Sequence, residues 1–118
     1  MLKSVAKVEA RASLCCSPIT GGSQLTTEAL ADLAVRLKAL ADPVRLKLLT
    51  HLLDQPGLES CTCILAPIVK LSEPTVSHHL KKLEASGLLT KERRGMSVFY
   101  RVDPESIHSI AKALHFDC

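Results

Sequence analysis

The sequence has very few aromatic side chains: its 118 residues include two Phe, one Tyr and no Trp. A core built without aromatic rings must rely on Leu, Ile, Val and Ala, which favours packed helices over a sandwich of two sheets. Long hydrophobic runs are absent too, since no stretch of about 18 apolar residues occurs, so no segment is expected to span a bilayer. Residues 1–12 lack an apolar run of signal-peptide length, which indicates a cytosolic protein.

Neither sign of charge dominates, because 15 Lys and Arg against 12 Asp and Glu leave a net charge of +3. This mild basic excess allows binding to nucleic acid without requiring it. With 47% hydrophobic and 23% charged residues, wholesale disorder is excluded, and the length suits one domain with an arm rather than two cores. Gly-rich phosphate loops, Ser/His/Asp or Cys/His constellations and convergent carboxylate pairs are missing, so the protein is not expected to be an enzyme.

The order of predicted elements is that of a winged helix-turn-helix, a mainly helical α+β fold. Residues 1–25, rich in small residues and turn formers near their end, are predicted to form a flexible N-terminal arm, and residues 26–118 the domain. Helix caps and periodicity predict helices over about residues 27–40, 43–54, 60–69 and 73–85, a hairpin of strands over 88–92 and 98–102, and a last helix from 104.

Two predicted helices have apolar residues at three-and-four spacing that we expect to face the core. In the first helix these residues are Leu30, Leu33, Ala34, Leu37 and Leu40. In the second helix they are Val44, Leu46, Leu49, Leu52 and Leu53.

The fourth predicted helix has a sharply divided surface. At 100° per residue its inward side is formed by Val76, Leu80 and Leu83, with His79 at the edge. The residues expected to point outward are Ser77, His78, Lys81 and Lys82. Their hydroxyl, imidazole and ammonium groups can bond base edges and phosphates in a major groove, although a solvated amphipathic helix would have the same composition.

The predicted hairpin favours the DNA-binding interpretation of this helix. Residues 73–101 contain six basic and three acidic side chains, so the basic excess lies in the fourth helix and the hairpin. Lys91, Arg93 and Arg94 at the hairpin tip are predicted to contact the phosphates beside the groove.

Three segments resemble the ArsR/SmtB family of metal-sensing repressors. Residues 38–46 (KALADPVRL) resemble the entry to the family's second helix, residues 71–83 (LSEPTVSHHLKKL) its recognition helix, and residues 84–89 with 94–100 its helix end and wing. The resemblance implies a homodimer that binds an imperfect palindrome in double-stranded operator DNA and releases it when metal binds. It also implies that the first and last helices form the dimer interface, and that Thr75, Ser77, His78 and Lys81 contact bases.

The sequence contains five cysteines, an odd number that argues against a structural disulfide framework in a cytosolic protein. Cys61-Thr62-Cys63 resembles the family's inducer motif at the start of the third helix, although Ile64 and Ala66 replace an acidic residue and a third cysteine found in some members. The missing ligands are then expected from the Cys15–Cys16 pair on the arm.

An all-sulfur site selects thiophilic ions. As(III) or Sb(III) on Cys15, Cys16, Cys61 and Cys63 is the preferred inducer, and Cd(II) or Pb(II) remains an alternative. Oxidation of the same thiols is a second alternative. No constitutive cofactor is expected. Zinc binding by the last helix is disfavoured because its acidic residues and His108 and His115 do not have the family's zinc spacing, and Cys118 has no assigned role.

Overall fold

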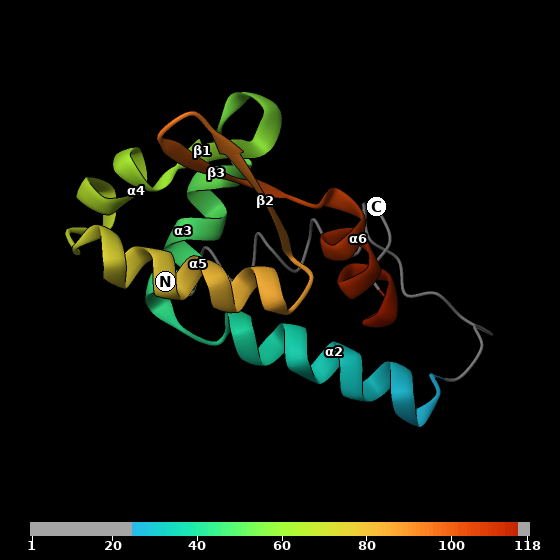
Figure 1. Cartoon of the computed structure of the whole chain (residues 1–118). Coiled ribbons are helices and arrows are strands. Elements are labelled where there is room, and N and C mark those ends of the chain that lie inside the picture. The colour runs from blue at the N-terminus through green and yellow to red at the C-terminus, as the bar shows by residue number, and fades with distance from the viewer. Residues whose placement is uncertain (1–24, 116–118) are drawn as a thin grey trace, which may run out of the picture.

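The computed structural model describes residues 25–115 (Figure 1). Apart from Leu25, the predicted arm with its two cysteines lies outside the described residues, and so does Cys118. The elements in chain order are α2 (Thr27–Leu40), α3 (Pro43–Leu53), the short 3-10 helix η1 (Pro56–Leu58), β1 (Glu59–Cys61), α4 (Thr62–Val69), α5 (Glu73–Ala85), β2 (Leu89–Arg94), β3 (Ser97–Val102) and α6 (Pro104–Ala113).

Polar caps start α2, α3 and α5 where the sequence predicts them. The side chain of Thr26 accepts a hydrogen bond from the backbone N–H of Ala29, and Asp42 accepts one from that of Arg45. Ser72 caps α5 in the same way, and a proline follows the cap in the first turn of α3, α5 and α6. Proline fits there because the first N–H groups of a helix have no intrahelical partner.

The hairpin is confirmed, and a third strand joins it. β2 and β3 pair antiparallel, and β1 pairs antiparallel with the other edge of β3, which gives the strand order β1-β3-β2. Residues 60 and 61 therefore belong to a strand, whereas the sequence predicts them in a helix. The strand is only three residues long and its partner lies about forty residues further along the chain, so local periodicity gives no signal for it.

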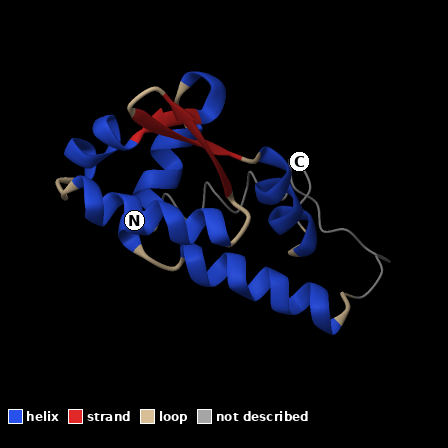
Figure 2. Ribbon diagram, viewed as in Figure 1, coloured by secondary structure: helices blue, strands red, loops and turns tan. Residues whose placement is uncertain are grey.

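The core lies between the inner sides of α3, α4 and α5 and the sheet (Figure 2). The inward side predicted for α5 is confirmed, since Val76, Leu80 and Leu83 are fully buried. The side predicted for α3 is partly wrong: Leu48 and Leu52 are fully buried, whereas Leu46 is 45% exposed. Leucines lie on more than one side of this helix, so its hydrophobic periodicity does not fix which side faces the core. Packing against the other elements sets that orientation.

α2 packs on the outside of the domain and contributes no fully buried residue. Leu33 and Leu40 contact the core, but Leu30 is 50% exposed and Leu37 is also exposed, contrary to the core-facing positions predicted for them. Figure 1 shows α2 on the side of α5 that faces away from the sheet, with α6 close to it. Leu30 and Leu37 thus form an exposed apolar side of α2 in the described part of the chain.

Within residues 25–115, no helix has the length and apolar character needed to cross a membrane.

We expect Leu52→Ala to lower the free energy of unfolding by about 2–5 kcal/mol, because it leaves a cavity in the core. Leu46→Ala in the same helix is the matched control and should cost clearly less, since its side chain is half exposed. Urea denaturation followed by circular dichroism at a fixed chain concentration measures both changes. Equal losses for the two variants would contradict the packing described for α3.

Candidate nucleic-acid interface and cysteine site

The outer face of α5, formed by Thr75, Ser77, His78, Lys81 and Lys82, presents polar and basic groups. All of these residues except the half-buried Ser77 are exposed. The hydroxyl of Thr75 lies 2.8 Å from that of Ser72 at the helix cap, so it is partly engaged at the start of α5. Within the described residues neither lysine has an ion-pair partner, which leaves both ammonium groups available to an anionic surface.

Arg45, in the first turn of α3, links the end of α2 to α5. Its Nε donates to the backbone carbonyl of Ala39 at 2.6 Å, and its Nη1 lies 3.2 Å from Nδ1 of His79 on α5. Desolvation lowers the pKa of His79, against the opposing charge of Asp42, which favours the neutral ring that accepts from Arg45. The prediction of His79 at the edge of the helix is confirmed, whereas its contact with Arg45 is not evident from the sequence.

Asp42 interacts with both Arg45 and His79. Its carboxylate accepts the backbone N–H of Arg45 and lies 4.0 Å from Nδ1 of His79. The hydrogen bond from the Arg45 backbone is the main cause that lowers the pKa of Asp42. One carboxylate therefore caps α3 and also faces the imidazole of the helix predicted to bind DNA.

The wing, defined as β2, β3 and their turn, separates its three predicted DNA-contacting cations. Lys91 and Arg93 are exposed, whereas Arg94 is half-buried. The guanidinium of Arg94 donates to both carboxylate oxygens of Glu59 on β1, at 2.7 and 3.1 Å, and to Glu92 at 2.9 Å. Successive strand residues point to opposite faces of the sheet, so Arg94 lies on the same face as Glu59 while Arg93 lies on the other.

The same guanidinium lies 4.5 Å from the centre of the Phe99 ring, in a cation–π contact. Arg101 adds a third bond to Glu59 at 3.3 Å. These bonds, above all the one from Arg94, lower the pKa of Glu59 and raise that of Arg94. The structure thus places Arg94 in a clamp between β1 and the wing, a role that the sequence does not reveal because β1 itself is not predicted.

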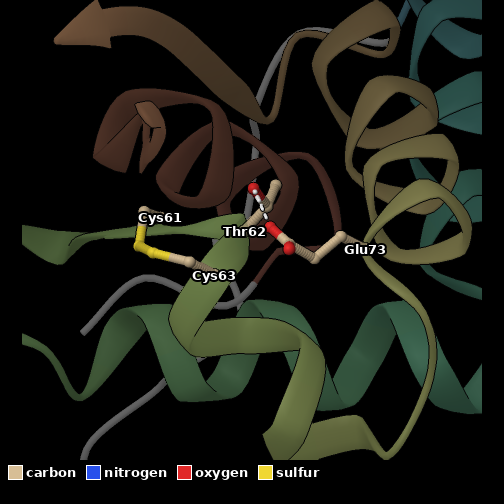
Figure 3. The surroundings of a disulfide bond; sticks show 4 residues. All are labelled: Cys61, Thr62, Cys63 and Glu73. Atoms are coloured by element: carbon tan, nitrogen blue, oxygen red, sulfur yellow. Dashed lines mark hydrogen bonds between the residues drawn. A yellow bond between two sulfur atoms is a disulfide. The ribbon is translucent and has the colours of Figure 1, made fainter. Parts of the chain in front are cut away.

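Cys61 and Cys63 lie at the junction of β1 and α4, where they are joined by a disulfide (Figure 3). The sequence predicts two free thiols at this position. Cys61 is buried, 3% exposed, whereas Cys63 in the first turn of α4 is exposed. A disulfide sulfur is not a thiolate ligand, so an ion can bind this pair only after reduction.

Thr62, between the two cysteines, contacts the start of α5. Its hydroxyl donates to Oε1 of Glu73 at 3.5 Å, a contact drawn in Figure 3. Over residues 25–115, no group of three or more Cys, His, Asp or Glu side chains is arranged to hold a metal ion. Cys15 and Cys16 lie outside the described residues, so the four-sulfur site stays a prediction.

The sequence profile of the arsR family of bacterial regulatory proteins matches residues 42–91, from the cap of α3 into β2. Three relatives are similar over this region and beyond. The Arsenic resistance transcriptional regulator ArsR1 of Pseudomonas putida is 41% identical over 68 residues, covering 58% of this chain and 52% of that protein. A Cadmium resistance transcriptional regulatory protein CadC homolog of Staphylococcus aureus is 35% identical, with coverage of 69% and 65%.

The Arsenical resistance operon repressor of Bacillus subtilis is 31% identical, and the match covers 71% of this chain and 78% of that protein. The chain spans about half to two thirds of the length of the Pseudomonas and Staphylococcus relatives. The family is one of regulatory proteins and not of enzymes, as the sequence analysis expects.

Solved structures of similar fold confirm the predicted winged helix-turn-helix. The homodimeric winged helix-turn-helix DNA-binding domain of a possible ArsR-family regulator from Mycobacterium bovis has a TM-score of 0.64 at 26% identity, over 81% of this chain and 87% of that one. The AntR antimony-specific transcriptional repressor has a TM-score of 0.65 at 28% identity, over 81% and 86%.

We expect Glu59→Gln to lower the urea midpoint of unfolding at pH 7, because the amide loses the charge-assisted bonds from Arg94 and Arg101. The lowered pKa of Glu59 means that its contribution is present above the pKa of an ordinary glutamate and is lost as the pH falls through the folded value. The gap between wild type and variant should therefore shrink from pH 7 to pH 3.

Glu92→Gln is the matched control, since the exposed Glu92 bonds Arg94 through one oxygen only. Its effect should be smaller at every pH. A gap for Glu59→Gln that stays constant over this pH range would contradict the ion-pair clamp.

Proposed function

Because the chain belongs to the arsR family of bacterial regulatory proteins, we propose that it is a cytosolic, DNA-binding repressor that leaves its operator when a thiophilic ion binds. The observation that carries this proposal is the exposed basic outer face of α5 beside a basic two-stranded wing. Relatives described as repressors of arsenical resistance support it.

In this proposal α5 lies in the major groove of double-stranded DNA. Ser77 and His78 contact base edges, with Thr75 and Lys81 beside them, and Lys82 reaches a phosphate. Lys91 and Arg93 of the wing contact the adjacent backbone. Arg94 serves the interface by holding the wing to β1, since its guanidinium is occupied by two carboxylates.

The repressor acts as a homodimer through α2 and α6. The exposed Leu30 and Leu37 of α2, and Leu114 just after α6, supply the apolar surface that an interface buries. The related Mycobacterium bovis domain is described as homodimeric. Two copies of α5 would then read the two halves of a palindrome about one helical turn apart.

The proposed inducer is As(III) or Sb(III), bound by thiolates of Cys61 and Cys63 together with Cys15 and Cys16. Similarity to regulators described as arsenic-resistance and antimony-specific supports this choice. Similarity to a cadmium-resistance regulator keeps Cd(II) or Pb(II) as the alternative. All four ions favour sulfur ligands, so the choice among them depends on how many thiols converge.

Ion binding would act on DNA through two contacts of the cysteine segment, defined as residues Cys61–Cys63. Cys61 pairs with Phe99 of the wing, and Thr62 bonds to Glu73, the first residue of α5. An ion that pulls on this segment therefore displaces both DNA-contacting elements. A shift from mostly bound to mostly free requires a preference of about 5 kcal/mol for the released state.

A redox-responsive repressor is a second candidate, and the disulfide between Cys61 and Cys63 favours it. Oxidation by hydrogen peroxide would convert the two thiols to this disulfide and reduce the peroxide to two molecules of water, which take up the two thiol protons, without any metal.

We expect His78→Ala and Lys81→Ala each to weaken operator binding by about tenfold, because each removes a polar contact worth roughly 1–3 kcal/mol. Lys47→Ala, an exposed lysine on α3, is the matched control and should bind as wild type does. Fluorescence anisotropy with the DNA upstream of the chain's own gene, over a series of salt concentrations, measures the affinities. Wild-type affinity and salt dependence in both α5 variants would refute the proposed interface.

We expect the Cys61→Ser, Cys63→Ser double variant to bind operator DNA as wild type does but to be no longer released by arsenite. The control Cys118→Ser should be released normally. Release is measured by anisotropy on reduced protein, with arsenite, Cd(II) and peroxide in separate arms. Release of the double variant by arsenite would contradict the thiolate site, and release of wild type by peroxide alone would favour the redox candidate.

A further inference from the structure

A cavity of about 300 Å³ lies between the second half of α2 and the second half of α5. It is open to solvent, since Val35 is 55% exposed. Val35 and Ala39 of α2 and Ala85 of α5 form its apolar wall, and the basic residues Lys38, Arg45 and Lys82 also line it. Of the described residues of the proposed inducer site, neither Cys61 nor Cys63 lines it.

Among the described residues that line the cavity there are three basic side chains and no carboxylate. Within residues 25–115, Lys38 and Lys82 have no ion-pair partner, and Arg45 commits its Nε and Nη1 to Ala39 and His79. Like charges brought together repel one another, so an anion between them is stabilised.

The apolar wall restricts which anion fits. Inorganic phosphate would satisfy the cations but would leave the surface of Val35, Ala39 and Ala85 in contact with water. The volume lies at the lower end of the range for small-molecule pockets, which suits a ligand of roughly ten non-hydrogen atoms. A short hydrocarbon body with one charged end matches both the wall and the cations.

We propose that this cavity binds a small amphipathic organic anion, with its carboxylate at Lys38, Arg45 and Lys82 and its hydrocarbon part against Val35, Ala39 and Ala85. Binding to the cavity does not rest on the proposed repressor function. If that function holds, the ligand would also bridge α2 to the DNA-contacting helix and compete with a phosphate for Lys82, and so weaken operator binding.

The test uses the full-length, ¹⁵N-labelled protein and octanoate as the probe, with octan-1-ol as its uncharged counterpart. In two-dimensional NMR titrations without DNA, octanoate should shift the amide signals of Val35, Ala39 and Ala85. Octan-1-ol and inorganic phosphate should each bind at least tenfold more weakly than octanoate. Octan-1-ol has no negative charge for the cations, and phosphate has no hydrocarbon part for the apolar wall.

The Lys38→Met, Lys82→Met double variant keeps the side-chain stems but removes two charges, and should bind octanoate at least tenfold more weakly. Lys47→Met, Lys112→Met is the matched control, since both lysines are exposed and neither lines the cavity. It should bind as wild type does. Ala85→Leu fills the cavity from its apolar side, and should weaken octanoate binding while the lysines remain.

Equal binding of octanoate to wild type and to the Lys38→Met, Lys82→Met variant would overturn the proposal. So would equal affinity for octan-1-ol and octanoate, or shifts confined to the exposed Leu30 and Leu37 side of α2. Failure here leaves the repressor proposal untouched, because that proposal is tested by operator binding and ion release on separate samples.

Discussion

The pairing of β1 with β3 is the contact on which the functional architecture depends. A three-residue strand has no stability of its own, so it needs both the ladder to β3 and the carboxylate of Glu59 held by Arg94 and Arg101. That pairing fixes Cys61 opposite Phe99 on the wing. Without it, the cysteine segment would be a loop beside the fold, with no direct contact to the wing.

α5 is held at two points by groups outside it. Glu73 at its first residue contacts Thr62 of the cysteine segment, and His79 in its middle contacts Arg45 from the first turn of α3. Each contact connects α5 to a different proposed ligand site. Thr62 lies between the two cysteines of the proposed ion site, and Arg45 lines the cavity proposed to bind an organic anion. α5, the helix proposed to bind DNA, is thus in contact with a residue of each proposed ligand site.

The sequence predicts α3, α5 and α6 well because each starts with a polar cap followed by a proline, and α2 because Thr26 caps it. It predicts the inner side of α5 well because the apolar residues of that helix follow one clean period. It fails for α3, where leucines at 46, 48, 49, 52 and 53 satisfy more than one helical orientation. Neither β1 nor the ion-pair clamp of Glu59 and Arg94 is predicted from the sequence, because both arise from contacts between distant parts of the chain. The motif predicts the position of the Cys61 and Cys63 pair in the fold, but it does not predict that a disulfide joins them.

The disulfide and the proposed ion site compete for the same two sulfurs. While Cys61 and Cys63 are bonded to each other, neither can donate an electron pair as a thiolate, so an oxidised chain would not respond to arsenite. Oxidation and ion binding would therefore be mutually exclusive states of one segment, and each would act on the wing and α5 through Cys61 and Thr62. The metal and redox candidates then differ in which state releases DNA, not in which residues carry the signal.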